Sequence, residues 1–267
     1  MAVGTHVRAA DAAGFGDEMQ RLRLYNVVAG LVHLAQVIAL LALSNDFSLP
    51  ITTQFAAGPP GSGSVTDREI VWDVPLGPAV ALFLAISAAD HFLLSAPGIF
   101  GWYARNLRRG INYGRWYEYA LSASLMVVLI AMLTGVSDVG ALLAILGVNA
   151  TMLLFGLMME LHNQTTSRTK WTSYVFGCFA GAVPWIVIAV YLAGAEAETG
   201  GSVPTFVYGI FVSLFLLFNS FAVNMVLQYK GVGPWRDYLF GEKVYILLSL
   251  TAKTALAWQV FANTLID

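Results

Sequence analysis

The stretch "YILLSLTAKTALAWQVF", residues 245–261, is apolar almost throughout, yet a lysine, Lys253, stands in its middle. If a membrane helix begins near Glu242, the eleven-residue separation places Lys253 about 16 Å along it, near the centre of a ~30 Å hydrocarbon core. A lysine side chain can reach only a few ångströms towards either surface. An ammonium at this depth therefore needs a partner carboxylate, a neutral state or a covalent modification.

The composition indicates that most of this chain is surrounded by lipid. Of its 267 residues, 58% are hydrophobic and only 11% are charged, whereas soluble domains carry about 25% charged residues. The net charge of −2 gives no support to nucleic-acid binding. The single cysteine, Cys178, excludes an internal disulfide, and we expect it to serve packing. The first apolar run is too long for a signal-peptide core, so we expect it to be retained.

Seven apolar runs are long enough to cross a bilayer as helices, which takes roughly 20 residues each. They occupy residues 22–44, 76–96, 114–136, 139–160, 171–194, 204–229 and 242–264. Most of the breaks between them combine Pro, Gly and charge. Strands of an outer-membrane barrel would be shorter and would alternate in polarity. The sequence predicts an all-α membrane protein, a single domain of residues 1–267 built as a seven-transmembrane-helix bundle.

The basic residues predict the orientation of the bundle, because they are enriched in cytoplasmic connections. Twelve of them fall on one side of the predicted membrane: Arg8, Arg21, Arg23, Arg105, Arg108, Arg109, Arg115, Arg168, Lys170, Lys230, Arg236 and Lys243. The other side carries Arg68 alone, among several acidic residues. We therefore expect a cytoplasmic N-terminus and, after seven crossings, an extracellular C-terminus.

The connection at residues 45–75 is the only long one between the predicted helices. Its centre, "AAGPPGSGS", is flanked by "LPITTQF" and "REIVWDV", and both flanks are rich in β-branched or aromatic residues. This pattern predicts a small extracellular β-hairpin that covers the bundle or meets a partner subunit. A loop without regular structure is the alternative.

Glu118, in "GRWYEYALSAS", is the best candidate partner for Lys253. It lies about one turn deeper than Arg115, and Ser122 follows four residues later on the same helical face. A long apolar run follows, which favours a buried carboxylate. In the alternative interpretation, Glu118 lies at the membrane interface and pairs with Arg115.

Two histidines fall in the cytoplasmic half with Glu118. His33 shares a helical face with Asn26 and Gln36, and His91 has a serine four residues to either side. These residues predict a polar network that extends to the cytoplasmic edge, although each histidine could equally be a buried hydrogen-bonding residue. The predicted members are His33, His91, Glu160, Arg115 and Asn149. Asp90 points away from His91 and could be a separate buried or interfacial acid.

No motif for metal binding or hydrolysis stands out, since neither HExxH nor GxSxG occurs. Aromatic residues are numerous in residues 171–194 and 204–229. They could simply fill the core, or they could form a slot for a flat conjugated ligand. Pro184 and Trp185, in the middle of one run, favour a local opening of that helix.

Seven helices with a mid-membrane lysine on the seventh resemble the retinal-binding rhodopsins. "SLTAKTAL", residues 249–256, looks like the retinal-lysine signature of the microbial rhodopsins, and "RWYEY", residues 115–119, looks like their counterion motif. Ser249 stands where pumps have a second carboxylate, and Leu129 stands where outward proton pumps have an internal proton donor. With the inverted orientation, the histidines and the long first connection, the chain is similar to the heliorhodopsins.

This resemblance implies a photosensor with all-trans-retinal attached to Lys253 as a Schiff base and Glu118 as its counterion. The residues expected near the Schiff base are Ser249, Ser87, Ser122 and Tyr119. Those expected around the retinal are Trp116, Met126, Pro184, Trp185, Phe218 and Phe221. It also implies a homodimer in the plasma membrane, a slow photocycle without net ion pumping, no enzymatic activity, and an unidentified cytoplasmic signalling partner.

Two other functions are compatible with the sequence. A light-driven proton pump or channel would use the same lysine, although the residues at 129 and 249 count against it. A membrane enzyme or small-molecule carrier could use Lys253 for an ion pair or for Schiff-base chemistry without a visible chromophore.

Overall fold

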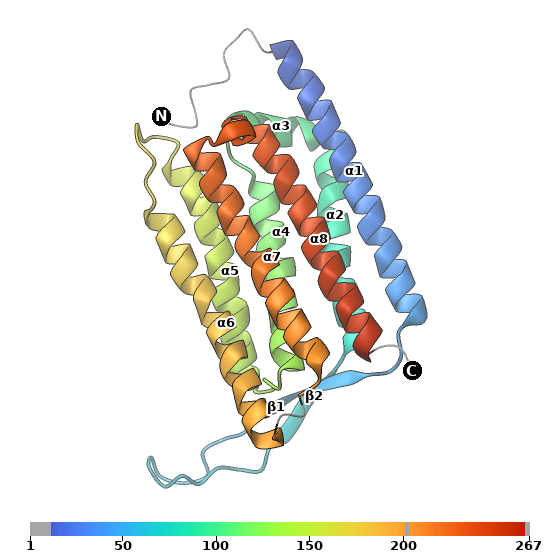
Figure 1. Cartoon of the computed structure of the whole chain (residues 1–267), viewed down its shortest axis with the longest axis vertical. Coiled ribbons are helices and arrows are strands. Elements are labelled where there is room, and N and C mark those ends of the chain that lie inside the picture. Colours follow the sequence, from blue (N-terminus) through green and yellow to red (C-terminus); the bar gives the residue numbers. More distant parts are fainter. Residues whose placement is uncertain (1–11, 201–202, 265–267) are drawn as a thin grey trace.

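The computed structural model describes residues 12–200 and 203–264. Within them, seven helices are long and apolar enough to cross a membrane, and they lie side by side in one bundle (Figure 1). They are α1 (Ala12–Leu43), α2 (Leu76–Ser95), α4 (Tyr113–Leu133), α5 (Val139–His162), α6 (Thr172–Thr199), α7 (Thr205–Lys230) and α8 (Tyr238–Thr264). Each corresponds to one of the seven apolar runs of the sequence.

The first helix is longer than its apolar run. The run predicts a start near residue 22, but α1 begins at Ala12 and its early turns extend past the rest of the bundle (Figure 1). Met19 and Leu22 are buried there in a cluster with Tyr103 and Leu107. Tertiary packing of this amphipathic segment therefore extends the helix beyond the apolar run, which marks only the lipid-embedded part.

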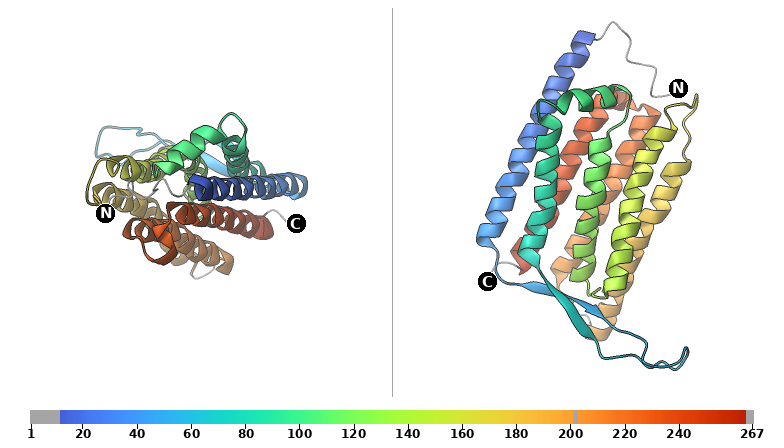
Figure 2. Two further views of the ribbon diagram at one scale, coloured as in Figure 1. Left: turned by 90° about the horizontal axis from the view of Figure 1, so that it is seen from above. Right: turned by 180° about the vertical axis from the view of Figure 1, so that it is seen from behind.

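A short helix that the sequence analysis treated as a connection lies across one end of the bundle (Figure 2). This is α3 (Phe100–Arg108), and a 3₁₀ turn, η3 (Gly233–Arg236), precedes α8. The helix α2 ends at Ser95 because Ala96 is extended ahead of Pro97. The end of the bundle that carries α3 is called the α3 end below.

The 45–75 connection forms a β-hairpin at the opposite end of the bundle, called the hairpin end below (Figure 1). Strand β1 (Ser48–Thr53) pairs antiparallel with β2 (Glu69–Pro75), with an irregularity after Ile51. Thr52 attaches the hairpin to the α4–α5 turn, because its amide donates to the Ser137 carbonyl oxygen at 2.7 Å. The two-stranded element agrees with the sequence prediction, while its side of the membrane stays a prediction.

The largest apolar cluster of the described residues fills the bundle interior between Lys253 and the hairpin end. It contains the α4 segment 126–132 and the α8 residues Leu256, Ala257 and Val260, all buried. Smaller clusters lie towards the α3 end, around Tyr245 and around Leu107. The two halves of the bundle therefore differ, because the buried charged residues described below lie outside the large apolar cluster.

Candidate functional site

Lys253 and Glu118 form a buried ion pair between α8 and α4. The Lys253 Nζ lies 2.8 Å from Glu118 Oε1 and 3.1 Å from Oε2, and the two side chains are only 3% and 5% exposed. Glu118 does not pair with Arg115, so the interfacial alternative is wrong. The carboxylate that the sequence selects as the partner of the buried lysine does contact it.

Hydroxyl groups complete the surroundings of this pair. Ser249, one turn before Lys253 on α8, accepts a hydrogen bond from Nζ at 2.8 Å. Ser87 on α2 donates to Glu118 Oε1 at 2.6 Å. The lysine nitrogen also lies 5.0 Å from the centre of the Tyr119 ring, and Ser122 is fully buried one turn beyond Glu118. All four residues that the sequence analysis expected near the Lys253 nitrogen therefore surround the pair.

The two histidines stack on each other beside the pair. Their ring centres are 5.7 Å apart, and the two ring planes are nearly parallel. His91 lies one turn from Ser87 on α2. The His91 Nδ1 is 2.8 Å from Asn26 Oδ1 on α1. His33 is fully buried, and neither of its ring nitrogens has a hydrogen-bond partner within the described residues. Two imidazoles thus lie close to the ion pair, and one has both nitrogens available.

Arg115 and Glu160 lie in a second buried cluster, not with the histidines as predicted. The Arg115 guanidinium is bound by Glu160 of α5 and by Glu242 of α8. Trp116 Nε1 donates to Glu160 at 2.7 Å, and the Asn112 side chain donates to Glu242 at 2.6 Å. Arg115 does not join the histidines because the carboxylates of Glu160 and Glu242, from two neighbouring helices, both reach its guanidinium at the α3 end.

Asn149 is also outside the predicted network. Its side-chain amide donates to the Ser124 hydroxyl at 3.0 Å, which links α5 to α4. The three-turn separation from Glu160 led to the prediction that the two residues act together. The two residues share one face of α5, but they meet different neighbouring side chains because they lie three turns apart. The hydrogen bond of Asn149 serves interhelical packing.

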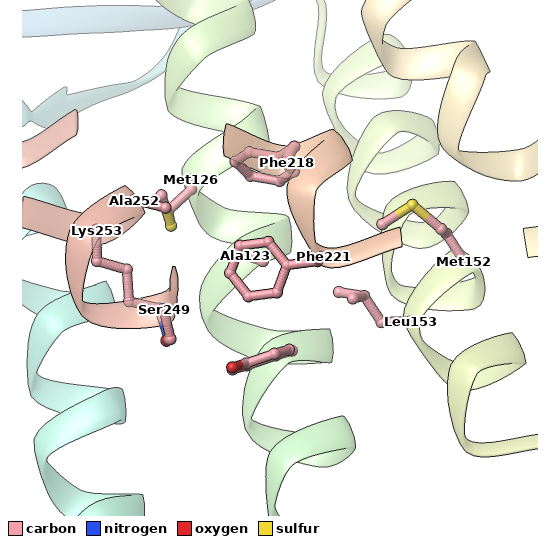
Figure 3. Close-up of a pocket in the computed structure, with 10 residues that line it drawn as sticks. Ala123, Met126, Met152, Leu153, Phe218, Phe221, Ser249, Ala252 and Lys253 are labelled. Atoms are coloured by element: carbon pink, nitrogen blue, oxygen red, sulfur yellow. The ribbon is translucent and has the colours of Figure 1, made fainter. Parts of the chain in front are cut away.

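Lys253 and Ser249 line a cavity with apolar side chains from three other helices (Figure 3). Met126 and Ala123 come from α4, and Phe218 and Phe221 come from α7. A larger cavity of about 260 Å³ lies next to the first. The two cavities share Tyr119, Met152, Leu153, Phe218 and Phe221. The Lys253 side chain therefore lines the smaller of two neighbouring apolar cavities that share aromatic walls.

Four of the predicted aromatic residues line the larger cavity, namely Trp116 and Trp185 together with the shared Phe218 and Phe221. Gly156 leaves room for the Trp116 indole, because a Cβ on residue 156 would lie 2.2 Å from that ring. Pro184 is buried inside α6 and lines neither of these two cavities, so its place in the retinal pocket stays a prediction. A proline ring next to a lining residue shapes the helix, while Trp185 makes the contact.

These residues fit retinal. The aldehyde of retinal can condense with a lysine amine, and its long conjugated chain matches a cavity with aromatic walls. Glu242, Asn112, Met152 and Leu153 are site residues that the sequence pattern did not predict. Glu242 served there only as a marker of a helix start, and nothing in the local pattern separates Met152 or Leu153 from lipid-facing residues.

Comparisons with known proteins agree with this geometry. The crystal structure of Exiguobacterium sibiricum rhodopsin superposes with a TM-score of 0.61 at 15% identity, covering 92% of this chain and 95% of that one. Opsin-1 of Neurospora crassa is 28% identical over 117 residues, which span 43% of this chain and 38% of Opsin-1. The heliorhodopsin family model matches residues 22–265. The chain therefore belongs to the heliorhodopsin family and is a retinal-binding, light-responsive protein of the membrane.

Proposed function

We propose that this protein is a photosensor in which Lys253 carries all-trans-retinal through a Schiff base and Glu118 is the counterion. The observation that carries the proposal is the buried Lys253–Glu118 pair at the wall of the aromatic cavity. Retinal, when bound, supplies the absorption of visible light and the change of shape that follows.

Glu118 holds a positive charge at the Lys253 nitrogen, because an opposite charge at hydrogen-bond distance favours the protonated form. The Ser249 and Ser87 hydroxyls support the two members of the pair from α8 and α2. Since no second carboxylate pairs with Lys253 in the described chain, Glu118 carries the whole counterion role. The colour of the pigment therefore depends mainly on this one carboxylate.

His33 and His91 receive the proton when it leaves the Lys253 nitrogen. Within the part of the chain that the structure describes, neither ring nitrogen of His33 has a hydrogen-bond partner, and the His33 ring stacks on that of His91. Imidazole is suited to this step because it binds and releases protons near neutral pH. Glu160 belongs to the separate Arg115 cluster, so it is not part of this first transfer.

The proton returns to Lys253 without crossing the membrane. The large apolar cluster, which includes Leu129, separates Lys253 from the hairpin end. Among residues 12–200 and 203–264, the buried charged residues other than the Lys253–Glu118 pair are Arg115, Glu160 and Glu242, in the cluster towards the α3 end. With polar groups on one side and apolar packing on the other, the photocycle is slow and ends without net pumping.

The location of the protein and its partners complete the proposal. The α3 end faces the cytoplasm, because it carries most of the basic residues, and the hairpin faces outwards. The protein is a homodimer in the plasma membrane, and a cytoplasmic partner reads the long-lived state, as in other local switches with global readouts.

The first test is to add all-trans-retinal to the apoprotein and record its spectrum. The wild type forms a visible band, Lys253→Ala forms none, and Lys243→Ala, a matched change on the same helix, keeps it. The second test illuminates vesicles with and without a protonophore. A sustained pH change that the protonophore abolishes would show a pump and remove the sensor-only reading, whereas slow flash-induced recovery without such a change supports it.

A further inference from the structure

The short helix α3 has one buried and one exposed face. Tyr103 and Leu107 are buried against α1 and the rest of the α3 end. The exposed face carries Trp102 and Arg105, and the exposed Arg109 directly follows the last residue of the helix in an α-helical backbone conformation. Their spacings of three and four residues place the three side chains on one side. In Figure 2 this helix lies across the end of the bundle, above α2 and α4. Its exposed side chains therefore lie at the depth of the membrane–water interface.

An aromatic row connects this face with the lipid-facing side of α4. The Trp102 ring lies 6.0 Å from that of Tyr113, which lies 6.5 Å from that of Tyr117. Tyr117 is 55% exposed, and Leu121, one turn further along α4, is 64% exposed. From Tyr113 to Leu121 the stripe spans about 12 Å along the helix axis. It thus runs from the bundle end into the depth of one membrane leaflet.

Within the described residues, the positive charges above this stripe have no acidic partner. None of the ion pairs found within residues 12–200 and 203–264 includes Arg105 or Arg109. Elsewhere at the same end, Lys243 is paired with Glu18. The Arg109 segment is fixed in place, because its carbonyl oxygen accepts a hydrogen bond from Gln164 at 2.9 Å. The guanidinium groups of Arg105 and Arg109 can therefore bind an anionic phosphate from a segment whose backbone is fixed.

We propose that an anionic phospholipid binds at this surface. Its phosphate pairs with Arg105 and Arg109, while Trp102 and Tyr113 contact the interfacial part of the lipid, as tryptophan and tyrosine do at membrane interfaces. One acyl chain follows the exposed α4 stripe past Leu121. The positive charges, the aromatic row and the apolar stripe are continuous, and this favours a phospholipid over a soluble acidic protein. A soluble protein could not contact the part of the stripe that lies inside the membrane.

The test measures lipid retention by the full-length, retinal-loaded protein, using native mass spectrometry with phosphatidylglycerol and phosphatidylcholine. The double variant R105Q/R109Q should bind phosphatidylglycerol about 30-fold more weakly, given the usual attraction per basic residue at a lipid surface. The matched variant K230Q/R236Q removes two exposed charges from the same end and should retain wild-type binding. Equal losses in the two variants would reduce the effect to diffuse surface charge and overturn the proposal.

A second pair of variants tests the path of the acyl chain. Leu121→Asn should lower the retention of both lipids, whereas Leu143→Asn, at an equally exposed leucine of α5, should not. Equal retention by Leu121→Asn and the wild type would remove the α4 stripe from the site. Displacement of the lipid by a soluble poly-glutamate peptide, without any preference for phosphatidylglycerol, would assign the arginines to an acidic protein instead.

Discussion

Replacement of Glu118 by glutamine tests the central ion pair most directly. The change removes one negative charge, keeps nearly the same shape, and leaves the Ser249 and Ser87 hydroxyls in place. Both partners of the pair are almost fully buried and in direct contact, and loss of one partner from such a pair costs about 3–5 kcal/mol. The variant should therefore be less stable by about 3–5 kcal/mol, which thermal unfolding of the retinal-loaded protein in detergent measures.

The same change should alter the colour of the pigment. The positive charge spreads further along the polyene when no counterion holds it near the nitrogen, so the absorption band should shift to the red. Absorption spectroscopy of the retinal-loaded variant measures this shift.

Asp90→Asn is the matched control for Glu118→Gln. It is also an acid-to-amide change, on α2 next to His91, at a carboxylate that forms no ion pair with Lys253. Its absorption band should stay close to that of the wild type, because charges at longer distance interact more weakly. A blue shift in Glu118→Gln, or an unchanged band, would mean that another group is the counterion.

Three other changes probe the groups around this pair. The double variant H33A/H91A should keep the visible band but alter proton return, and unchanged kinetics in flash photolysis would reduce both histidines to packing residues. Arg115→Met leaves two buried carboxylates without a cation and should lower the stability by about 3 kcal/mol or more, seen as a lower thermal midpoint in detergent. Gly156→Ala should displace the adjoining indole and lower that midpoint, whereas Gly147→Ala, which has open space, should not.

The sequence predicts the seven helices and the Lys253–Glu118 pair well, because both depend on simple quantities. A helix needs a certain apolar length to cross lipid, and a lysine at mid-membrane depth limits its partner to a few buried carboxylates. The early turns of α1 and the helix α3 depend on packing at the bundle end, where Met19 and Leu107 are buried together. A search for apolar runs cannot detect such amphipathic segments.

The polar residues show the limit of reasoning from helical spacing. The spacing correctly groups His33 with Asn26 on one face of α1, and Asn26 contacts His91 across the α1–α2 interface. It fails for Asn149 and Glu160, which share a face of α5 but contact different partners. Spacing fixes the direction of a side chain, but the rotation and tilt of the neighbouring helix decide what it meets.

The separation of the two buried ion clusters bears on the choice between sensor and pump. Lys253 and Glu118 form a pair of opposite charges, whereas Arg115 is shared by two acids. Hydrogen bonds from Trp116 and Asn112 supply the further donors that these acids need. Because the two acids of the second cluster already accept hydrogen bonds from these donors, a proton leaving Lys253 gains little by reaching them. Within the described residues, His33 is the buried histidine whose two ring nitrogens have no hydrogen-bond partner, and it stacks on His91 beside the Lys253–Glu118 pair. This arrangement favours storage of the proton over its transport.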